Sequence, residues 1–148
     1  MKKVVKFGGS SLASARQFKK VGDIIRADKS RRYVIPSAPG KRNSKDTKVT
    51  DMLYECYAAA STGASYKKLL EAIKARYQEI IDGLELKLSL EKEFSLIREN
   101  FAGKAGKDYA ASRGEYLNRK GNRQGLRSFP RRVLKRYRYG ELSRLRVH

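Results

Sequence analysis

The order of the first forty residues constrains the fold more than any other feature of the chain. Residues 3–7 (KVVKF) predict a short buried strand that ends at Gly8 and Gly9, and residues 32–37 predict a second strand before a proline–glycine break. Between them, Ser14 and Gln17 have the spacing of a helix-capping box, which predicts a helix over about 14–28. Strand, helix and strand at this spacing indicate a βαβ unit with a parallel sheet, and therefore an α/β fold.

The first helix and the four that follow are predicted from apolar residues recurring at helical spacing. The later helices are expected over 50–60, 65–82, 89–101 and 107–118. The side chains expected to face the core are Phe18, Val21, Ile24 and Ile25 in the first helix, Leu53, Cys56, Tyr57 and Ala60 in the second, and Leu69, Leu70, Ile73, Tyr77, Ile80 and Ile81 in the third.

Charge and composition narrow the classes of function. The formal net charge of +20 favours phosphate-bearing partners, such as nucleotides, nucleic acid or an anionic membrane. No apolar run reaches the roughly 20 residues that a transmembrane helix needs, and the N-terminus does not resemble a signal peptide. One cysteine, Cys56, excludes an intrachain disulfide, and we expect a cytoplasmic protein in which Cys56 is a small buried hydrophobe. The one histidine, His148, is the last residue, which excludes chemistry that needs an internal histidine.

Half of the net charge lies in the last fifth of the chain. Residues 119–148 contain nine arginines and one acidic residue, whereas lysine outnumbers arginine before Asn118. So abrupt a change in residue usage predicts two parts: a folded part at 1–118, and a basic, Arg-rich tail at 119–148 that is frameshifted, joined on or disordered.

The stretch VKFGGSS has the parts of a phosphate cradle. Glycines let backbone N–H groups approach an anion, a following helix N-terminus adds a favourable dipole, and a lysine adds a full charge. Lys6, Gly8, Gly9 and Ser10 supply these parts between a strand and a helix. The spacing is neither a Walker A loop nor a dinucleotide fingerprint, and an ordinary strand-to-helix turn remains the alternative.

Three stretches together resemble the aspartate kinases of the amino acid kinase family. VKFGGSS resembles the opening motif of that family, SAPGKRNSKDTKVTDML its second loop, and SRGEYLN (residues 112–118) its substrate motif built on Gly-Glu. They occur in the family's order and span residues 1–118. The resemblance implies the N-terminal half of an amino acid kinase-like three-layer α/β/α sandwich with a mainly parallel sheet.

The resemblance also implies a reaction, the transfer of the ATP γ-phosphate to the side-chain carboxylate of L-aspartate. This is the first step towards lysine, threonine and methionine. By resemblance, Lys6 is catalytic and binds the phosphates together with Gly8, Gly9 and Ser10, while Thr50 and Glu115 bind aspartate. ATP is the co-substrate and Mg²⁺ is expected with it, but no metal ligands are assigned. Taken residue by residue, Lys6 and Glu115 also fit solvated surface side chains, and Thr50 also fits a helix cap.

The resemblance ends after residue 118. The family continues with a further buried strand, the rest of the nucleotide site and C-terminal domains through which it usually forms homo-oligomers, whereas this chain continues with the basic tail. We therefore expect the 148-residue chain to lack kinase activity by itself. The alternative function is a non-catalytic basic protein that binds nucleic acid or other polyanions through tail arginines. A small kinase for another amino acid is a third possibility, which the long second loop and the Gly-Glu motif disfavour.

Overall fold

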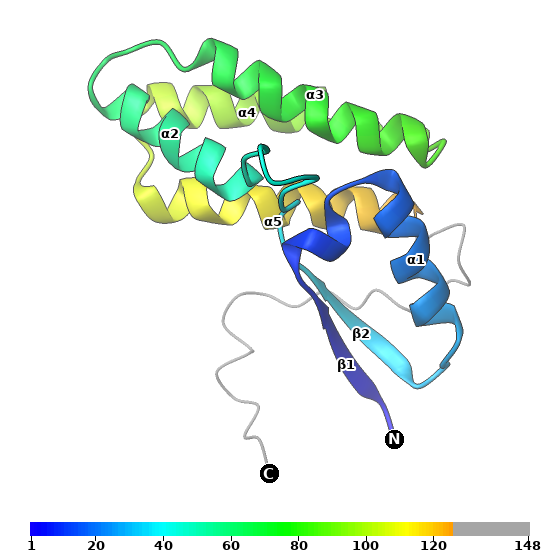
Figure 1. The fold of residues 1–148 in the computed structure, drawn as a ribbon. Helices are drawn as coiled ribbons and strands as arrows, with labels where there is room; N and C mark the ends of the chain where they lie inside the picture. Colours follow the sequence, from blue (N-terminus) through cyan, green and yellow to red (C-terminus); the bar gives the residue numbers. More distant parts are fainter. Residues whose placement is uncertain (126–148) are drawn as a thin grey trace.

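The computed structural model describes residues 1–125; residues 126–148, which include most of the predicted basic tail, lie outside the described residues. The elements follow in the order β1 (Lys3–Phe7), the short 3₁₀ helix η1 (Gly9–Leu12), α1 (Ala15–Arg26), β2 (Arg31–Pro36), α2 (Val49–Ser61), α3 (Lys67–Gly83), α4 (Glu91–Ala102) and α5 (Lys107–Gly125). Figure 1 shows the two strands extending from a group of four helices, α2 to α5, with α1 beside the strands.

The predicted βαβ unit is confirmed. β1 and β2 pair in parallel, with Lys6 opposite Ile35. The hydroxyl of Ser14 caps α1 by accepting a hydrogen bond from the backbone N–H of Gln17 at 3.4 Å. Parallel strands end at the same edge of a sheet, so the loops that follow β1 and β2 leave from one place.

α1 covers one face of the two strands. Phe7 and Val34 pack against a small core made of Leu12, Phe18, Val21, Ile25 and Ile80. Because side chains alternate along a strand, Val4 and Lys6 fall on the opposite face. The prediction that Ile24 is buried is wrong, because this side chain is 47% exposed. At 100° per residue, Ile24 lies on the flank of the stripe that the other three residues define.

The larger core lies among α2, α3, α4 and α5, and includes Ala38 from the loop after β2. Leu53, Cys56, Ile73, Tyr77 and Ile81 are buried there as predicted, and Tyr57, Ala60 and Leu69 pack against its edge. α5 continues to Gly125, seven residues beyond the predicted helix end at Asn118. Lysine, arginine and asparagine are tolerated inside a helix, so the change in composition after Asn118 does not end it.

Candidate active site

The glycine–serine turn (residues 8–12) leads from the end of β1 into η1. Gly8 precedes η1 in an extended conformation, and its carbonyl oxygen accepts a hydrogen bond from Ser11 N at 3.1 Å. A Cβ atom placed on Gly8 would meet nothing within 4 Å. Gly8 therefore faces open space, and its backbone is accessible to a ligand.

The second glycine of this turn contacts the β2–α2 loop (residues 37–48). Gly40 N donates a hydrogen bond to Gly9 O at 2.8 Å. A Cβ atom on Gly9 would lie 2.9 Å from Ala38 O, and one on Gly40 would lie 2.6 Å from the carbonyl carbon of Gly9. Neither position accepts a side chain without a backbone shift, so the two loops that leave the parallel strands are held together by a glycine–glycine contact.

The same loop is held from the other side by α5. A Cβ atom on Gly114 would lie 2.6 Å from the Cβ of Ala38 and 3.5 Å from side-chain atoms of Val49 and Leu53. The hydroxyl of Tyr77 donates to Gly114 O at 2.7 Å. Four residues further along α5, the buried amide of Asn118 donates to Ser37 O at 2.6 Å. The SRGEYLN segment is thus packed directly against the residues that follow β2.

These contacts decide where the predicted site residues lie. Gly9 lies beside Ala38 and Gly40, and Gly114 lies beside Ala38 and Val49, so the three motif regions meet around the start of the β2–α2 loop. Thr50 is half-buried in the first turn of α2, and Glu115 is exposed on α5. Lys6 and Ser10 are also exposed. The structure therefore brings the backbone regions of these residues together, while the side chain of Lys6 extends from β1 into solvent. Thr50 does not cap α2, because the cap position is Lys48.

Comparison with solved structures gives a close match over most of the chain. The aspartate kinase of Clostridium acetobutylicum aligns with 86% of this chain at 46% sequence identity and a TM-score of 0.81. The chain is a relative of the aspartate kinases. Its fold is accordingly the N-terminal part of the α/β amino acid kinase fold, as the sequence motifs predict.

Further comparisons agree with an aspartate kinase relationship. Aspartokinase 3 of Bacillus subtilis (strain 168) is 48% identical over 88 residues, which are 60% of this chain and 19% of that protein. Escherichia coli aspartokinase III aligns with 86% of the chain at 22% identity and a TM-score of 0.65, which adds evidence for the fold. No family model matches the chain. The chain spans about a fifth of the curated relative, and 30% and 29% of the two solved structures.

Three residues that hold this region together were not among the predicted site residues. Gly40 was predicted only as a turn, Asn118 as the last residue of a helix, and Arg76 was not singled out. Arg76 is 5% exposed, although charged residues are rarely buried. Arg76 falls three residues after Ile73 and four before Ile80, on the buried stripe of α3. This helical spacing is the sequence signal that could have predicted its burial.

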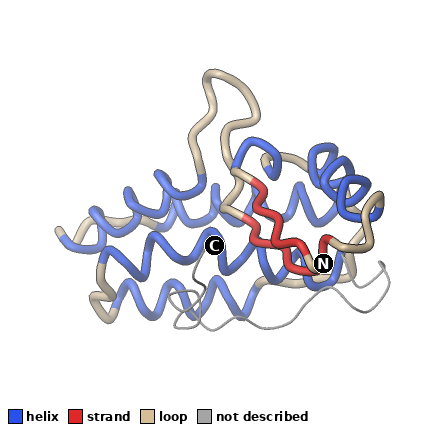
Figure 2. Tube along the Cα trace, turned by 90° about the horizontal axis from the view of Figure 1, so that it is seen from below, coloured by secondary structure: helices blue, strands red, loops and turns tan. Residues whose placement is uncertain are grey.

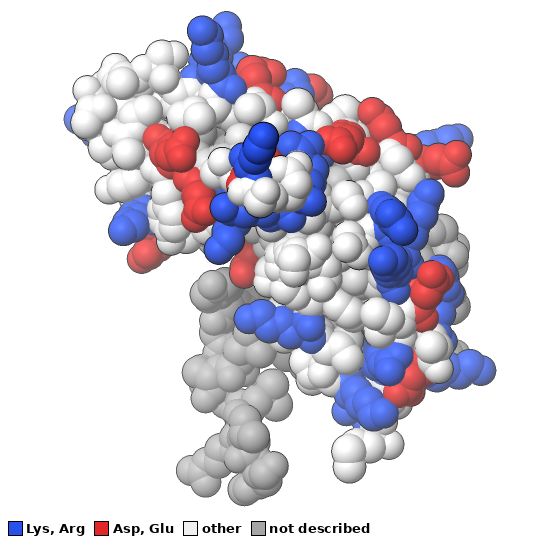
Figure 3. Space-filling view, viewed as in Figure 1, with Lys and Arg blue, Asp and Glu red and all other residues white. Residues whose placement is uncertain are grey.

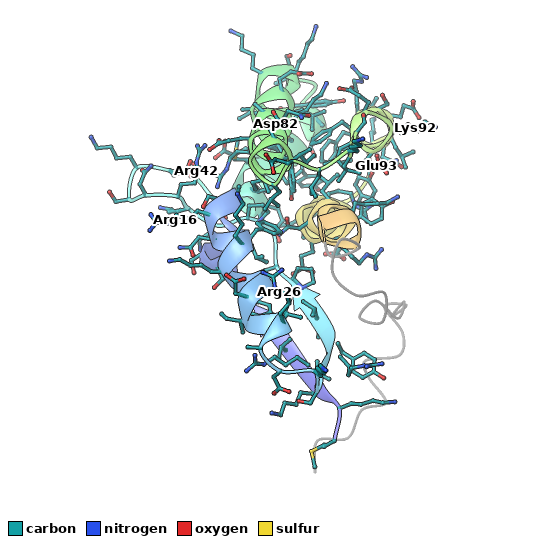
Figure 4. The ribbon with its side chains drawn as sticks, turned by 90° about the vertical axis from the view of Figure 1, so that its right-hand side faces the viewer. Arg16, Arg26, Arg42, Asp82, Lys92 and Glu93 are labelled. Atoms are coloured by element: carbon teal, nitrogen blue, oxygen red, sulfur yellow. The ribbon has the colours of Figure 1, made fainter. Side chains whose placement is uncertain are left out.

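Arg76 is the centre of a charged cluster on the β2–α2 loop. Its guanidinium donates to Gly40 O and, at 2.6 Å, to Thr47 O, and lies 3.2 Å from a carboxylate oxygen of Asp46. Arg42 pairs with Asp46 at 2.9 Å and with Glu79 at 2.7 Å. In Figure 4, Arg42 projects from this loop on the same side as Arg16, which lies in the first turn of α1. Hydrogen bonds from Arg42 hold the pKa of Asp46 well below its usual range, and burial lowers the pKa of Arg76.

The β2–α2 loop is also the most prominent projection of the described chain. Figure 2 shows it as the tan segment that stands out beyond the helices, between a strand and a helix. On the face seen in Figure 3, Lys and Arg side chains gather on this loop and over α1, with Asp and Glu between them. Positive charge therefore lies on the loop that leaves β2, at the edge where open α/β sheets bind their ligands.

The described residues do not supply a metal site or a membrane span. Within residues 1–125, no three His, Cys, Asp or Glu side chains come together in a way that could hold a metal ion. No helix between residues 1 and 125 is both long enough and apolar enough to cross a bilayer.

Proposed function

We propose that residues 1–118 form the part of an aspartate kinase that cradles the phosphates of ATP and contacts L-aspartate. The whole enzyme would transfer the γ-phosphate of ATP to the side-chain carboxylate of L-aspartate. The observation that supports this most is the meeting of three motif regions at Ala38. A Cβ atom on Gly9 would lie 2.9 Å from the carbonyl oxygen of Ala38, and one on Gly114 would lie 2.6 Å from its Cβ. The E. coli aspartokinase III structure is a complex with aspartate and ADP, which makes both ligands the first to test here.

The proposed roles are those that the resemblance to aspartate kinases implies, and charge and exposure are compatible with them. Lys6 is exposed one residue before the end of β1, where its ammonium group would stabilise negative charge on the transferring phosphoryl group. The backbone of Gly8, Gly9 and Ser10 would donate hydrogen bonds to phosphate oxygens, because Gly8 has no neighbour within 4 Å of its missing Cβ. Glu115 would pair with the ammonium group of aspartate, and Thr50 would hydrogen-bond to the same substrate.

The same proposal includes the setting of the enzyme. We expect it to act in the cytoplasm, in the pathway to lysine, threonine and methionine, with Mg²⁺ held by residues outside the described part. The 148-residue chain by itself should not consume ATP in the presence of aspartate above a no-enzyme control. The tail arginines on which polyanion binding would depend lie largely outside the described residues, and no contact in residues 1–125 favours that function.

Ligand titration of the 148-residue chain, followed by ¹⁵N NMR, tests the proposal. ATP should shift the amide signals of Gly8, Gly9 and Ser10, and L-aspartate should shift those around Thr50 and Glu115. Lys6→Met should weaken the response to ATP, whereas Lys19→Met, a matched exposed lysine on α1, should leave it unchanged.

The aspartate arm needs its own controls. Glu115→Gln should remove the response to L-aspartate, and Glu99→Gln, an exposed glutamate on α4, should retain it. D-aspartate tests stereochemical fit. Shifts confined to lysines and arginines elsewhere, or equal responses to L-aspartate, D-aspartate and acetate, would show that the assigned residues do not form the site.

A further inference from the structure

We infer that Arg76 of α3 is a positioning residue, which clamps the β2–α2 loop and thereby fixes both the glycine–serine turn and the start of α2. The inference rests on the proposed function for its meaning in catalysis, because those two segments carry the proposed phosphate and aspartate contacts. The clamp itself does not depend on the proposed function, because it rests only on contacts within residues 40–76.

The clamp spans the two ends of the projecting part of the loop. The two terminal nitrogens of the Arg76 guanidinium donate to Gly40 O at the beginning and to Thr47 O at the end. The carboxylate of Asp46 lies 3.2 Å from one of these nitrogens. A planar guanidinium can serve three acceptors in fixed directions at once, which an ammonium group does less well. Arg76 therefore closes residues 40–47 into a ring anchored on α3.

Each end of this ring is connected to a segment that carries a proposed ligand contact. Gly40, whose carbonyl is held by Arg76, donates its N–H to Gly9 O at 2.8 Å. At the other end, Thr47 lies two residues before Val49, whose N–H donates to Pro39 O at 3.1 Å as α2 begins. A shift of Arg76 would therefore move the backbone of Gly9 and that of Thr50 together.

Burial distinguishes Arg76 from a surface salt bridge. A buried cation pays a desolvation penalty that an apolar side chain of similar size would avoid, so packing of α3 does not by itself require arginine here. The carbonyl oxygens of Gly40 and Thr47 would be left without these donors if the guanidinium were removed. Arg42, by contrast, is 38% exposed and pairs with Asp46 and Glu79 at the outside of the loop, where ion pairs contribute little. Arg42 is therefore the matched control.

Amide hydrogen exchange on the 148-residue chain tests the clamp without any ligand. Arg76→Met should accelerate exchange at Gly40 and Val49 by at least about tenfold, while Ile97 in the core of α4 changes by less than about threefold. Arg76→Lys should fall between wild type and Arg76→Met, and Arg42→Met should stay near wild type. Equal acceleration at Gly40 and Ile97 would reduce Arg76 to a contributor to global stability, and unchanged exchange at Gly40 would overturn the clamp. If Arg76→Met does not fold, the same exchange measurement on Arg76→Lys decides whether Arg76 clamps the loop. Failure of both to fold would overturn the positioning role.

Ligand binding tests the catalytic meaning separately. Arg76→Met should weaken the NMR-detected binding of ATP and of L-aspartate together by roughly fivefold or more, whereas Glu115→Gln weakens only aspartate binding. If wild type binds neither ligand, the proposed function fails while the exchange experiment still decides the clamp. If wild type binds both and Arg76→Met binds them equally well, the positioning role fails while the proposed function stands.

Discussion

Gly114 lies where α5 packs against the β2–α2 loop, and an alanine there would clash sterically with Ala38. The new Cβ would lie 2.6 Å from the Cβ of Ala38. Carbon atoms pack best at about 3.5–4.0 Å, so α5 and the loop would have to separate by roughly 1 Å. The loop cannot yield easily, because Asn118 of the same helix holds Ser37 O at 2.6 Å.

Two opposing effects set the magnitude of Gly114→Ala. Alanine favours the helix over glycine by about 1 kcal/mol, and overpacking in a core costs about 1–3 kcal/mol. The clash involves a Cβ attached to the backbone rather than the end of a flexible side chain, which places its cost at the upper end of that range. We expect a net destabilisation of about 1–2 kcal/mol, or a fall in Tm of roughly 3–8 °C for a chain of this size.

Urea and thermal denaturation, monitored by circular dichroism, measure this effect. Ala58→Gly, at an exposed position in α2, measures how much stability a helix of this chain loses when alanine is replaced by glycine. Ala38→Gly removes the opposing methyl group, so the double variant Gly114→Ala with Ala38→Gly should be more stable than additivity predicts by about 1 kcal/mol or more. A Gly114→Ala variant as stable as wild type, or a double variant that is strictly additive, would refute the packing argument.

Two further predictions concern ionisable groups in this region. The depressed folded-state pKa of Asp46 means that its carboxylate stabilises the fold above its unfolded pKa, about 3.9, and that this contribution is lost as pH falls below that value. The difference in urea midpoint between wild type and Asp46→Asn should therefore shrink between about pH 6 and about pH 3, and a constant difference would contradict the pairing. Burial raises the pKa of the Cys56 thiol to about 11, and its side chain is 0% exposed. A thiol reagent at about pH 8 should label it at least about 100-fold more slowly in the native chain than in denaturant. Equal rates would show that the α2 core opens freely.

Local signals account for the parts of the fold that the sequence predicts. The first strand, the Ser14 cap and the buried stripe of α1 all depend on residues within one turn or one strand of each other. The parallel pairing follows from the strand–helix–strand order, and the structure confirms it with β1 beside β2. The second strand begins and ends one residue earlier than predicted, at Arg31 and Pro36. Helical spacing likewise identifies the apolar core residues of α2 and α3, because these side chains recur on the face of each helix that packs against its neighbours.

The parts that sequence patterns miss depend on contacts between distant segments. The 3₁₀ helix η1 forms from Gly9–Leu12, three of whose four residues have weak helical preference, where the chain must turn from β1 towards Ser14. The requirement for glycine at residue 114 appears only when α5 meets Ala38, 76 residues earlier in the chain. An interior glycine in an amphipathic segment predicts only a weaker helix, and cannot indicate which neighbour needs the space.

A buried arginine at position 76 does something that a buried leucine at the same helical position could not do. A leucine at position 76 would continue the apolar stripe formed by Ile73, Tyr77 and Ile80. What it could not do is donate to the carbonyl oxygens of Gly40 and Thr47, which lie on a loop that has no regular secondary structure to satisfy them. At the point where the two strand-end loops touch, Gly9 and Gly40 have no side chains that could fix the loops in place. The anchor must therefore come from another element, and α3 supplies it through a residue that is charged because its partners are backbone oxygens and one carboxylate.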